Sequence, residues 1–319
     1  MHSYSLIAPA KINLHLEIIG DRPDGFHELV MILQSIELAD QIDIQANSTQ
    51  NINIHSNHPQ VPLDETNLAY RAAQLMCEAF PDVYHNFGGI DIVIKKNIPV
   101  AAGLAGGSSN AAAVLVGINM MWELGLTQPE LQGLAAQLGS DIPFCVSGGT
   151  AIATGRGEKL DPINDLDNLW LVLAKYSNLS VSTAWAYQTY RQQYSSTYIS
   201  EEKDIKSRTA KLHSGPLVSA IIHKQTKEIG KLLYNDLEKV VLPEYPQVAQ
   251  LRSAFAQTEI LGTMMSGSGP TVFALCESEE KAVRSKHNVK EAINDPNLDF
   301  WVTRLSSGGI QVGASGEIL

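Results

Sequence analysis

The chain of 319 residues is poor in charge: charged residues make up 18% of it, against about 25% in ordinary soluble domains. No block rich in Lys and Arg is present, and the formal net charge is −11. A general binder of nucleic acid or of an anionic membrane carries the opposite charge, so the composition argues against both partners. An anionic substrate would need local help from a lysine, a helix N-terminus or a metal ion.

Cysteine is also scarce, with Cys77, Cys145 and Cys276 and no Cys-x-x-Cys pair. An odd number of cysteines without metal-type spacing favours buried thiols in a reducing compartment. The N-terminal residues lack a basic region followed by an apolar run, which is the pattern of a signal peptide. From these features we expect a cytoplasmic protein.

No apolar run is long enough for a membrane helix. Residues 97–122 contain no charged residue, but the small and polar residues 106–110 interrupt them. The remainder, 110–122, would span only about 20 Å as a helix, whereas a membrane helix needs about 20 continuous apolar residues. The sequence therefore predicts no membrane partner.

The pattern of the first third favours an α+β fold. Residues 12–18 alternate apolar and polar side chains as a half-buried strand does, and 20–25 have the composition of a turn. A second apolar run follows at 29–38. Further short strands are predicted at 42–44, 52–54 and 89–95, with one helix at 66–80. Consecutive strands of this kind are typical of α+β proteins rather than of a doubly wound parallel sheet.

The length suggests about two domains. We place their boundary in the polar residues 164–168, which gives domains 1–165 and 166–305 and a Gly/Ser-rich tail, 306–319, that we expect to be mobile. The mixed-charge residues 201–206 are expected to be solvated surface. The remaining patterns predict helices at 108–124, 127–138, 183–193, 216–223, 226–234, 246–257 and 279–293, and strands at 150–153, 169–174, 262–265, 272–276 and 300–305.

The most informative segment is residues 99–113, PVAAGLAGGSSNAAA. A strand at 90–95 leads into it, and the first turn of the following helix would present unpaired N–H groups to a ligand. Backbone donors and a helix dipole together bind an anion well. The alternative is an ordinary glycine turn before a helix. The loop is neither a Walker A motif nor a G-x-G-x-x-G dinucleotide fingerprint.

Local preferences predict which residues of this loop have special roles. Alanine with a positive φ costs on the order of 1 kcal/mol, so we assign that conformation to Gly103, Gly106 and Gly107. Ser108 and Ser109 are the expected N-cap residues. A second glycine turn, residues 266–270 (SGSGP), joins two apolar strands. It is either a plain turn or a second wall around bound phosphates.

Two ionisable residues stand beside these segments. Lys11 begins the first strand, either as an exposed strand end or as an ammonium group that needs a partner among small and apolar neighbours. Asp141 follows the helix stop at Gly139 and either caps a short helix or takes part in chemistry. If both converge on the loop, they suit phosphoryl transfer to an alcohol. His55 and His58 lack carboxylate or cysteine company, so we predict no metal site there.

Three ordered motifs, at 9–13 (PAKIN), 99–113 and 266–270, resemble those of the GHMP kinases, named for galactokinase, homoserine, mevalonate and phosphomevalonate kinases. Residues 22–27 (RPDGFH) and 139–144 (GSDIPF) narrow the resemblance to the branch whose substrate is a cytidine-diphosphate-linked methylerythritol. The resemblance implies a two-domain α+β architecture, with an N-terminal ribosomal-S5-domain-2-like domain and a C-terminal ferredoxin-like domain.

The same resemblance implies transfer of the γ-phosphoryl group of ATP, with Mg²⁺, to the 2-hydroxyl of that substrate, in the non-mevalonate route to isoprenoid precursors. It implies that Lys11 and Asp141 are the catalytic pair. The residues that it implies for ATP are Pro99, Val100, Ala101, Ala102, Gly103, Leu104, Ala105, Gly106, Gly107, Ser108, Ser109, Gly267, Ser268 and Gly269. Those that it implies for the substrate are Asn13, Phe26, His27, Asp141, Thr183 and Tyr187.

In this scheme cytosine lies between the rings of Phe26 and Tyr187, and His27 reads its edge. Phe26 stands where a tyrosine is common, which removes a hydroxyl but keeps the stacking face. A GHMP kinase acting on homoserine or mevalonate would share the glycine loops but would leave residues 22–27 unexplained. A non-catalytic nucleotide sensor would not need Lys11 and Asp141. For partners we expect a small-molecule substrate, no nucleic acid, no membrane, and a monomer or weak homodimer.

Overall fold

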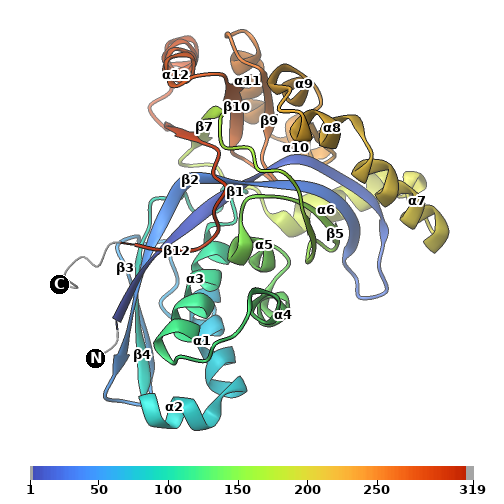
Figure 1. Cartoon of the computed structure of the whole chain (residues 1–319). Coiled ribbons are helices and arrows are strands. Elements are labelled where there is room, and N and C mark those ends of the chain that lie inside the picture. Colours follow the sequence, from blue (N-terminus) through green and yellow to red (C-terminus); the bar gives the residue numbers. More distant parts are fainter. Residues whose placement is uncertain (1–2, 314–319) are drawn as a thin grey trace.

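The computed structural model describes residues 3–313, which form two β-sheets with helices packed on them (Figure 1). The larger sheet is built on a long antiparallel hairpin of β1 (Ser3–Asp21) and β2 (His27–Asn47), drawn in blue. Its order is β12-β1-β2-β4-β3, with β5 paired to β2 and β8 to β1. None of the helices within residues 3–313 has the length and apolar character of a membrane span.

The first half of the chain covers one face of this sheet with helices. Its remaining elements are β3 (Ile52–Ser56), α1 (Leu68–Ala79), α2 (Pro81–Phe87), β4 (Gly89–Lys95), α3 (Gly106–Met121), α4 (Gln128–Leu138), α5 (Ile142–Ser147), β5 (Thr150–Gly155) and β6 (Lys159–Pro162). Small residues let α3 lie close to the strands: a Cβ at Gly117 would meet Ile44 at 2.3 Å and Leu6 at 2.5 Å. The predicted capping box of Thr127 and Glu130 is present at the start of α4.

The second half contains the smaller sheet. Its elements are β7 (Trp170–Tyr176), α6 (Thr183–Tyr194), a 3₁₀ turn (Ser195–Thr197), α7 (Glu202–His213), α8 (Pro216–Ile222), α9 (Thr226–Lys231), β8 (Tyr234–Asn235), α10 (Glu238–Glu244), α11 (Pro246–Ala256), β9 (Gly262–Met265), β10 (Val272–Cys276), α12 (Glu279–Ile293) and β11 (Leu298–Arg304). The order β11-β7-β10-β9 is fully antiparallel. Numbered along the chain this is 4-1-3-2, with α11 and α12 before its second and fourth strands, which is the ferredoxin-like arrangement.

The middle of β1 is buried on both faces. The alternation at 12–18 predicts a half-buried strand, yet every residue from Ala8 to Leu14 is buried. Leu6 and Ala8 belong to a buried cluster with residues of α3. Ile12 belongs to a second cluster, which contains Phe273 of the smaller sheet. The two halves of the chain therefore share β1 as a common wall.

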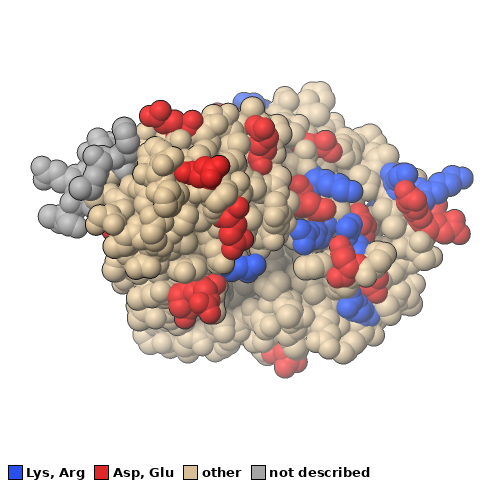
Figure 2. Space-filling view, turned by 90° about the horizontal axis from the view of Figure 1, so that it is seen from below, with Lys and Arg blue, Asp and Glu red and all other residues tan. Residues whose placement is uncertain are grey.

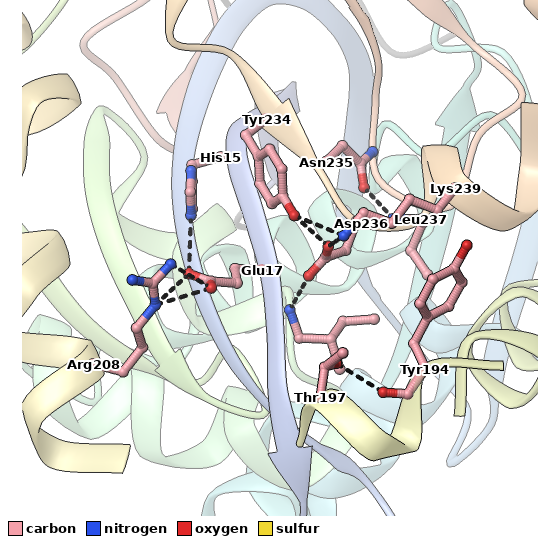
Figure 3. A network of polar contacts seen from close by, with 11 residues as sticks. His15, Glu17, Tyr194, Thr197, Arg208, Tyr234, Asn235, Asp236, Leu237 and Lys239 are labelled. Carbon is pink, nitrogen blue, oxygen red and sulfur yellow. Dashed lines mark hydrogen bonds and ion pairs between the residues drawn. The ribbon is translucent and has the colours of Figure 1, made fainter. Parts of the chain in front are cut away.

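A polar network next to β1 strengthens this connection (Figure 3). Strand β8 runs parallel to β1, with Asn235 opposite Leu16. The buried carboxylate of Asp236 accepts hydrogen bonds from the Ile18 N–H at 2.8 Å, the Tyr234 hydroxyl at 2.6 Å and Lys239 Nζ at 2.7 Å. The Lys239 ammonium group also lies over the ring of Tyr234, 5.5 Å from its centre. A short segment of the second half is thus locked onto a strand of the first.

The expected mobile tail does not begin at residue 306. The Ser306 N–H donates to the Ser35 carbonyl at 2.9 Å, and β12 (Gln311–Val312) pairs with β1 opposite Ile7 and Leu6. Backbone pairing, which Gly/Ser composition does not reveal, holds residues 306–313 in place. Residues 314–319 of the predicted tail lie outside the described residues. The mixed-charge stretch at 201–206 forms the start of α7 and has one partly buried residue, Ile205.

Candidate active site

A cavity of about 1030 Å³ lies where the two halves of the chain meet β1. Residues 99–108 form one side of it, and the helix α6 and residues 267–268 contribute another. Of the residues that the sequence nominates, Lys11, Asn13, Phe26, His27, Asp141, Thr183 and Tyr187 all line this cavity. Ser109 and Gly269 are not part of its lining. Segments far apart in sequence therefore converge on one space.

The glycine-rich loop has a backbone that local preference does not predict. Ala101 and Ala105 have positive φ angles of 50° and 55°, as does Gly103 at 73°. The assignment of positive φ to Gly106 and Gly107 is wrong, because both belong to the first turn of α3. Glycine leaves room at 106 instead, since a Cβ there would lie close to Lys96 Nζ, at 3.0 Å, and to Ile98 Cγ2, at 3.1 Å.

The start of α3 leaves backbone N–H groups without helical partners at the cavity. The N-cap position is Ala105, so the prediction of Ser108 or Ser109 as N-cap is wrong. Ser109 instead donates its hydroxyl to the Pro9 carbonyl at 2.7 Å, which fixes α3 to β1. The first intrahelical hydrogen bond runs from the Ser109 N–H to the Ala105 carbonyl at 2.9 Å. The N–H groups of residues 106–108 precede this bond, and all three residues line the cavity.

The second glycine turn packs backbone to backbone against the first. A Cβ at Gly103 would stand 2.2 Å from the Ser266 carbonyl oxygen, and the Ser266 hydroxyl donates to the Gly103 carbonyl at 3.0 Å. Asn235 supports the second glycine turn, because its side-chain amide donates to the carbonyls of Met265 and Gly267 at 2.8 Å each. The two loops are therefore held in one rigid unit.

Lys11 and Asp141 face each other within the cavity. The antiparallel register of β1 and β2 shifts on either side of Lys11 and Asn13, and such irregularities turn side chains toward a site. Lys11 Nζ is 2.9 Å from Asn13 Oδ1 and 3.7 Å from Asp141 Oδ2. Asp141 precedes α5, but its side chain makes no capping hydrogen bond, so its carboxylate is free to act in the cavity.

Aromatic side chains gather at the end of the cavity near the β1–β2 turn. The rings of His27 and Tyr187 are 5.1 Å apart and tilted by 36°. His27 Nε2 is buried without a hydrogen-bond partner, and burial, reinforced by Arg191 and opposed by Asp21, lowers the His27 pKa. Burial also raises the pKa of Tyr187. Both rings are therefore neutral near pH 7, which suits contacts with an uncharged nucleobase.

The cavity lining carries more cations than carboxylates, although the protein is acidic. It includes Lys11, Lys96, Arg156 and Arg191 and the carboxylate of Asp141, and carboxylates outside the lining pair with Lys96 and Arg191. In Figure 2 acidic side chains are spread over the drawn face, whereas most basic ones lie toward its right side, among acidic ones. Of the cations in the lining, Lys11 adjoins the glycine loop, because its N–H donates to the Leu104 carbonyl at 3.1 Å, and it can help an anionic ligand there.

Three cations of the cavity lie outside the residues that the sequence nominates: Lys96, Arg156 and Arg191. Lys96 directly follows the strand that leads into the glycine loop, and Arg156 stands between two glycines of a hairpin turn. Both contexts are signals that could have found them. Arg191 is an ordinary polar residue of α6 and carries no such signal.

Within residues 3–313 no group of three or more His, Cys, Asp or Glu side chains is arranged to hold a metal ion. The cavity offers Mg²⁺ one carboxylate, on Asp141, and the hydroxyl of Ser108. Mg²⁺ in nucleotide sites usually takes one or two protein carboxylates plus phosphate oxygens and water. The donor set therefore fits an ion that arrives with a nucleotide.

Two family models match the chain. The model described as GHMP kinases N terminal domain matches residues 67–149, and the one described as GHMP kinases C terminal matches residues 217–295. Curated relatives carry the name 4-diphosphocytidyl-2-C-methyl-D-erythritol kinase. The chain is 65% identical over 316 residues to the protein of Gloeothece citriformis and 62% identical over 316 residues to that of Nostoc punctiforme. Both alignments cover 99% of this chain and 100% of the relative.

Solved structures agree with these matches. A crystal structure of 4-(cytidine 5'-diphospho)-2C-methyl-D-erythritol kinase has 28% identity and a TM-score of 0.72, covering 95% of this chain and 100% of that one. Homoserine kinase from Cytophaga hutchinsonii has a TM-score of 0.76 at 18% identity, with 98% of each chain covered, and shows the shared fold alone. The expected two-domain α+β architecture is confirmed.

Proposed function

The chain belongs to the GHMP kinases and, within them, to the 4-diphosphocytidyl-2-C-methyl-D-erythritol kinases, and we propose how its cavity performs that reaction. The reaction transfers the γ-phosphoryl group of ATP to the 2-hydroxyl of the substrate, giving ADP and the 2-phosphate, in the non-mevalonate pathway. The observation that carries the proposal is the contact of Lys11 and Asp141, 3.7 Å apart, in the cavity that the N-terminus of α3 enters.

ATP binds through the residues at the start of α3. The N–H groups of residues 106–108 and the helix dipole receive the phosphates, as helix N-termini do for anions. The turn at Gly267 and Ser268 closes the other side, supported by the hydrogen bonds of Ser266 and Asn235. Mg²⁺ bound with the nucleotide would be held by the Asp141 carboxylate and the Ser108 hydroxyl and would supply positive charge at the phosphates.

Asp141 and Lys11 serve the acceptor hydroxyl. The Asp141 carboxylate accepts or orients the hydroxyl proton, and the Lys11 ammonium group keeps that carboxylate ionised. Lys11 also offsets the negative charge that develops on the transferred group. Asn13 holds the Lys11 ammonium through its side-chain oxygen at 2.9 Å. Positioning and charge supply most of the catalysis in reactions of this type.

The cytidine part of the substrate binds at the aromatic end of the cavity. Phe26 and Tyr187 provide stacking faces, and the Nε2 of His27, which has no hydrogen-bond partner in the protein, contacts the polar edge of the base. Thr183 shares a 2.8 Å hydrogen bond with Ser268 and so connects the substrate end to the phosphate turn. We further propose that the enzyme works in the cytoplasm as a monomer or weak homodimer.

Substitution of the facing pair tests the mechanism. We expect Asp141→Asn and Lys11→Ala each to lower kcat by roughly 10²- to 10⁴-fold, because each removes a group that acts on the transferred proton or charge. An ADP-release assay measures kcat, and equilibrium titration with ATP should show that nucleotide binding persists. Near wild-type rates in either variant would remove that residue from the mechanism.

A substrate panel tests the reaction itself. The same assay is run with 4-diphosphocytidyl-2-C-methyl-D-erythritol, with homoserine, with mevalonate, and with methylerythritol phosphate that lacks the cytidine portion. We expect ADP release with the first compound alone. Faster turnover of homoserine or mevalonate would assign the protein to another GHMP activity, and no turnover with any compound would favour a nucleotide sensor.

A further inference from the structure

The turn between β5 and β6 presents an arginine to the cavity in a fixed conformation. Arg156 stands between Gly155 and Gly157, which have φ angles of 72° and 115°. The Gly157 N–H donates to the Thr154 carbonyl at 3.1 Å, and the Arg156 N–H donates to Glu158 Oε2 at 2.8 Å. Few residues other than glycine adopt the two flanking conformations, so this turn is built for one backbone shape.

The guanidinium group of Arg156 is tied to the helix that precedes Asp141. Its Nη2 donates to the Ala136 carbonyl at 2.5 Å, in the last turn of α4. Carbonyls in the last turn of a helix lack intrahelical partners, and a cation there also interacts favourably with the helix dipole. The turn itself packs on Ser140, because a Cβ at Gly157 would lie 3.6 Å from the Ser140 Cβ. Arg156 is thus anchored on the corner that carries Asp141.

The same guanidinium group lies over the ring of Phe26, with its central carbon 5.2 Å from the ring centre. Phe26 is 49% exposed, so much of its ring makes no contact within the protein. Because Phe26 lines the cavity, the ring is open to a ligand there while the arginine holds it. A planar cation over an aromatic ring attracts it electrostatically and limits its rotation.

We propose that Arg156 is a positioning residue that holds Phe26 for stacking on the pyrimidine base of the substrate. This inference rests on the proposed function, in which Phe26 contacts cytosine. Arg156 acts through Phe26 and fixes its distance from the corner that carries Asp141. Phe26 therefore contacts the pyrimidine base of the substrate at a fixed distance from Asp141, which acts on the substrate hydroxyl.

A double-mutant cycle tests this role. The variants are Arg156→Met, which keeps the length of the side chain without charge or donors, Phe26→Leu, and both together. The control is Arg284→Met, which removes an exposed arginine of α12 that pairs with Glu259. The ADP-release assay gives kcat and the KM values for the cytidine substrate and for ATP, and titration with cytidine diphosphate gives binding without turnover.

We expect Arg156→Met to raise the KM of the cytidine substrate about three- to tenfold, the effect of losing a moderate cation–π contact. The kcat and the KM of ATP should stay within about twofold of wild type, and adding Arg156→Met to Phe26→Leu should raise the KM no further. Effects that multiply in the double variant would overturn the inference, as would a loss in kcat or in ATP binding. Wild-type turnover of the substrate is judged separately, so failure of the proposed function is distinguished from failure of this role.

Discussion

Ala101 adopts a conformation that its side chain disfavours. It is exposed, and its φ is 50°. An alanine in the left-handed region costs about 1–2 kcal/mol, whereas glycine adds about 0.4–1 kcal/mol of unfolded-state entropy. Ala101→Gly should therefore raise the free energy of unfolding by about 1 kcal/mol or less, as measured by denaturant titration.

Ala210 provides the matched control for that substitution. It is an exposed residue inside α7, where glycine is unfavourable by about 1 kcal/mol. Ala210→Gly should lower the free energy of unfolding by that amount. If Ala101→Gly destabilised the protein as much as Ala210→Gly does, the strain in the loop would be absent in solution.

His27 should make stability depend on pH. Burial lowers its pKa below the ordinary value of about 6.5, so the unfolded chain binds a proton more readily than the folded one. The free energy of unfolding should then fall as the pH drops below about 6.5, and His27→Gln should weaken this fall. Denaturant titrations at several pH values measure the effect. Parallel pH curves for the two proteins would contradict it.

At the scale of elements, the two-residue strand β8 supports the second glycine turn through Asn235. Asn235 is buried, donates to two carbonyls of the 262–267 segment and accepts from the Leu237 N–H at 2.9 Å. Asn235→Ala leaves these groups unpaired and should lower the free energy of unfolding by roughly 2–4 kcal/mol. The KM of ATP should also rise, because Gly267 loses its support.

The control for Asn235 lies on β3. Asn53 is exposed and donates to Asp91 at 2.8 Å, so Asn53→Ala should change the free energy of unfolding by less than about 0.5 kcal/mol. Denaturant titration and steady-state kinetics measure both variants. An unchanged KM of ATP in a folded Asn235→Ala protein would show that the turn holds its shape without this residue.

Elements with strong periodicity could be predicted from the sequence. The boundaries of β4, β9, β10 and α12 follow directly from apolar patterns and turn residues. The two-residue strands β8 and β12 could not be predicted, because their pairing partners on β1 are more than 200 residues away. The left-handed Ala101 and Ala105 could not be predicted, because local preference assigns positive φ angles to the glycines of the loop.

The site could be predicted as far as its motifs reach. Lys11, Asp141 and the glycine loops are marked by their flanking residues, and they meet in one cavity. Arg191 comes from a helix whose own pattern does not indicate the cavity, whereas the two glycines beside Arg156 are a signal that could have indicated it. Only the packing of the two halves around β1 brings these cations together.

At the scale of the whole molecule, the cysteines should be inert. Cys77, Cys145 and Cys276 are all buried, and burial raises the pKa of Cys77 to about 11 and that of Cys276 to about 12. Since the thiolate is the reactive form, iodoacetamide at neutral pH should label none of them in the native protein and all of them after unfolding. Mass spectrometry counts the labels, and modification of the native protein would contradict the expectation.

The return of the chain to its first strand has a consequence for how the protein can be rebuilt. The Gly313 N–H donates to the Ser5 carbonyl at 2.8 Å, so the described ends lie on neighbouring strands. A short linker could join them, and new termini could be opened in an exposed connection elsewhere. Such a circular permutant should still fold around β1, because it keeps every strand neighbour and alters only the order of synthesis.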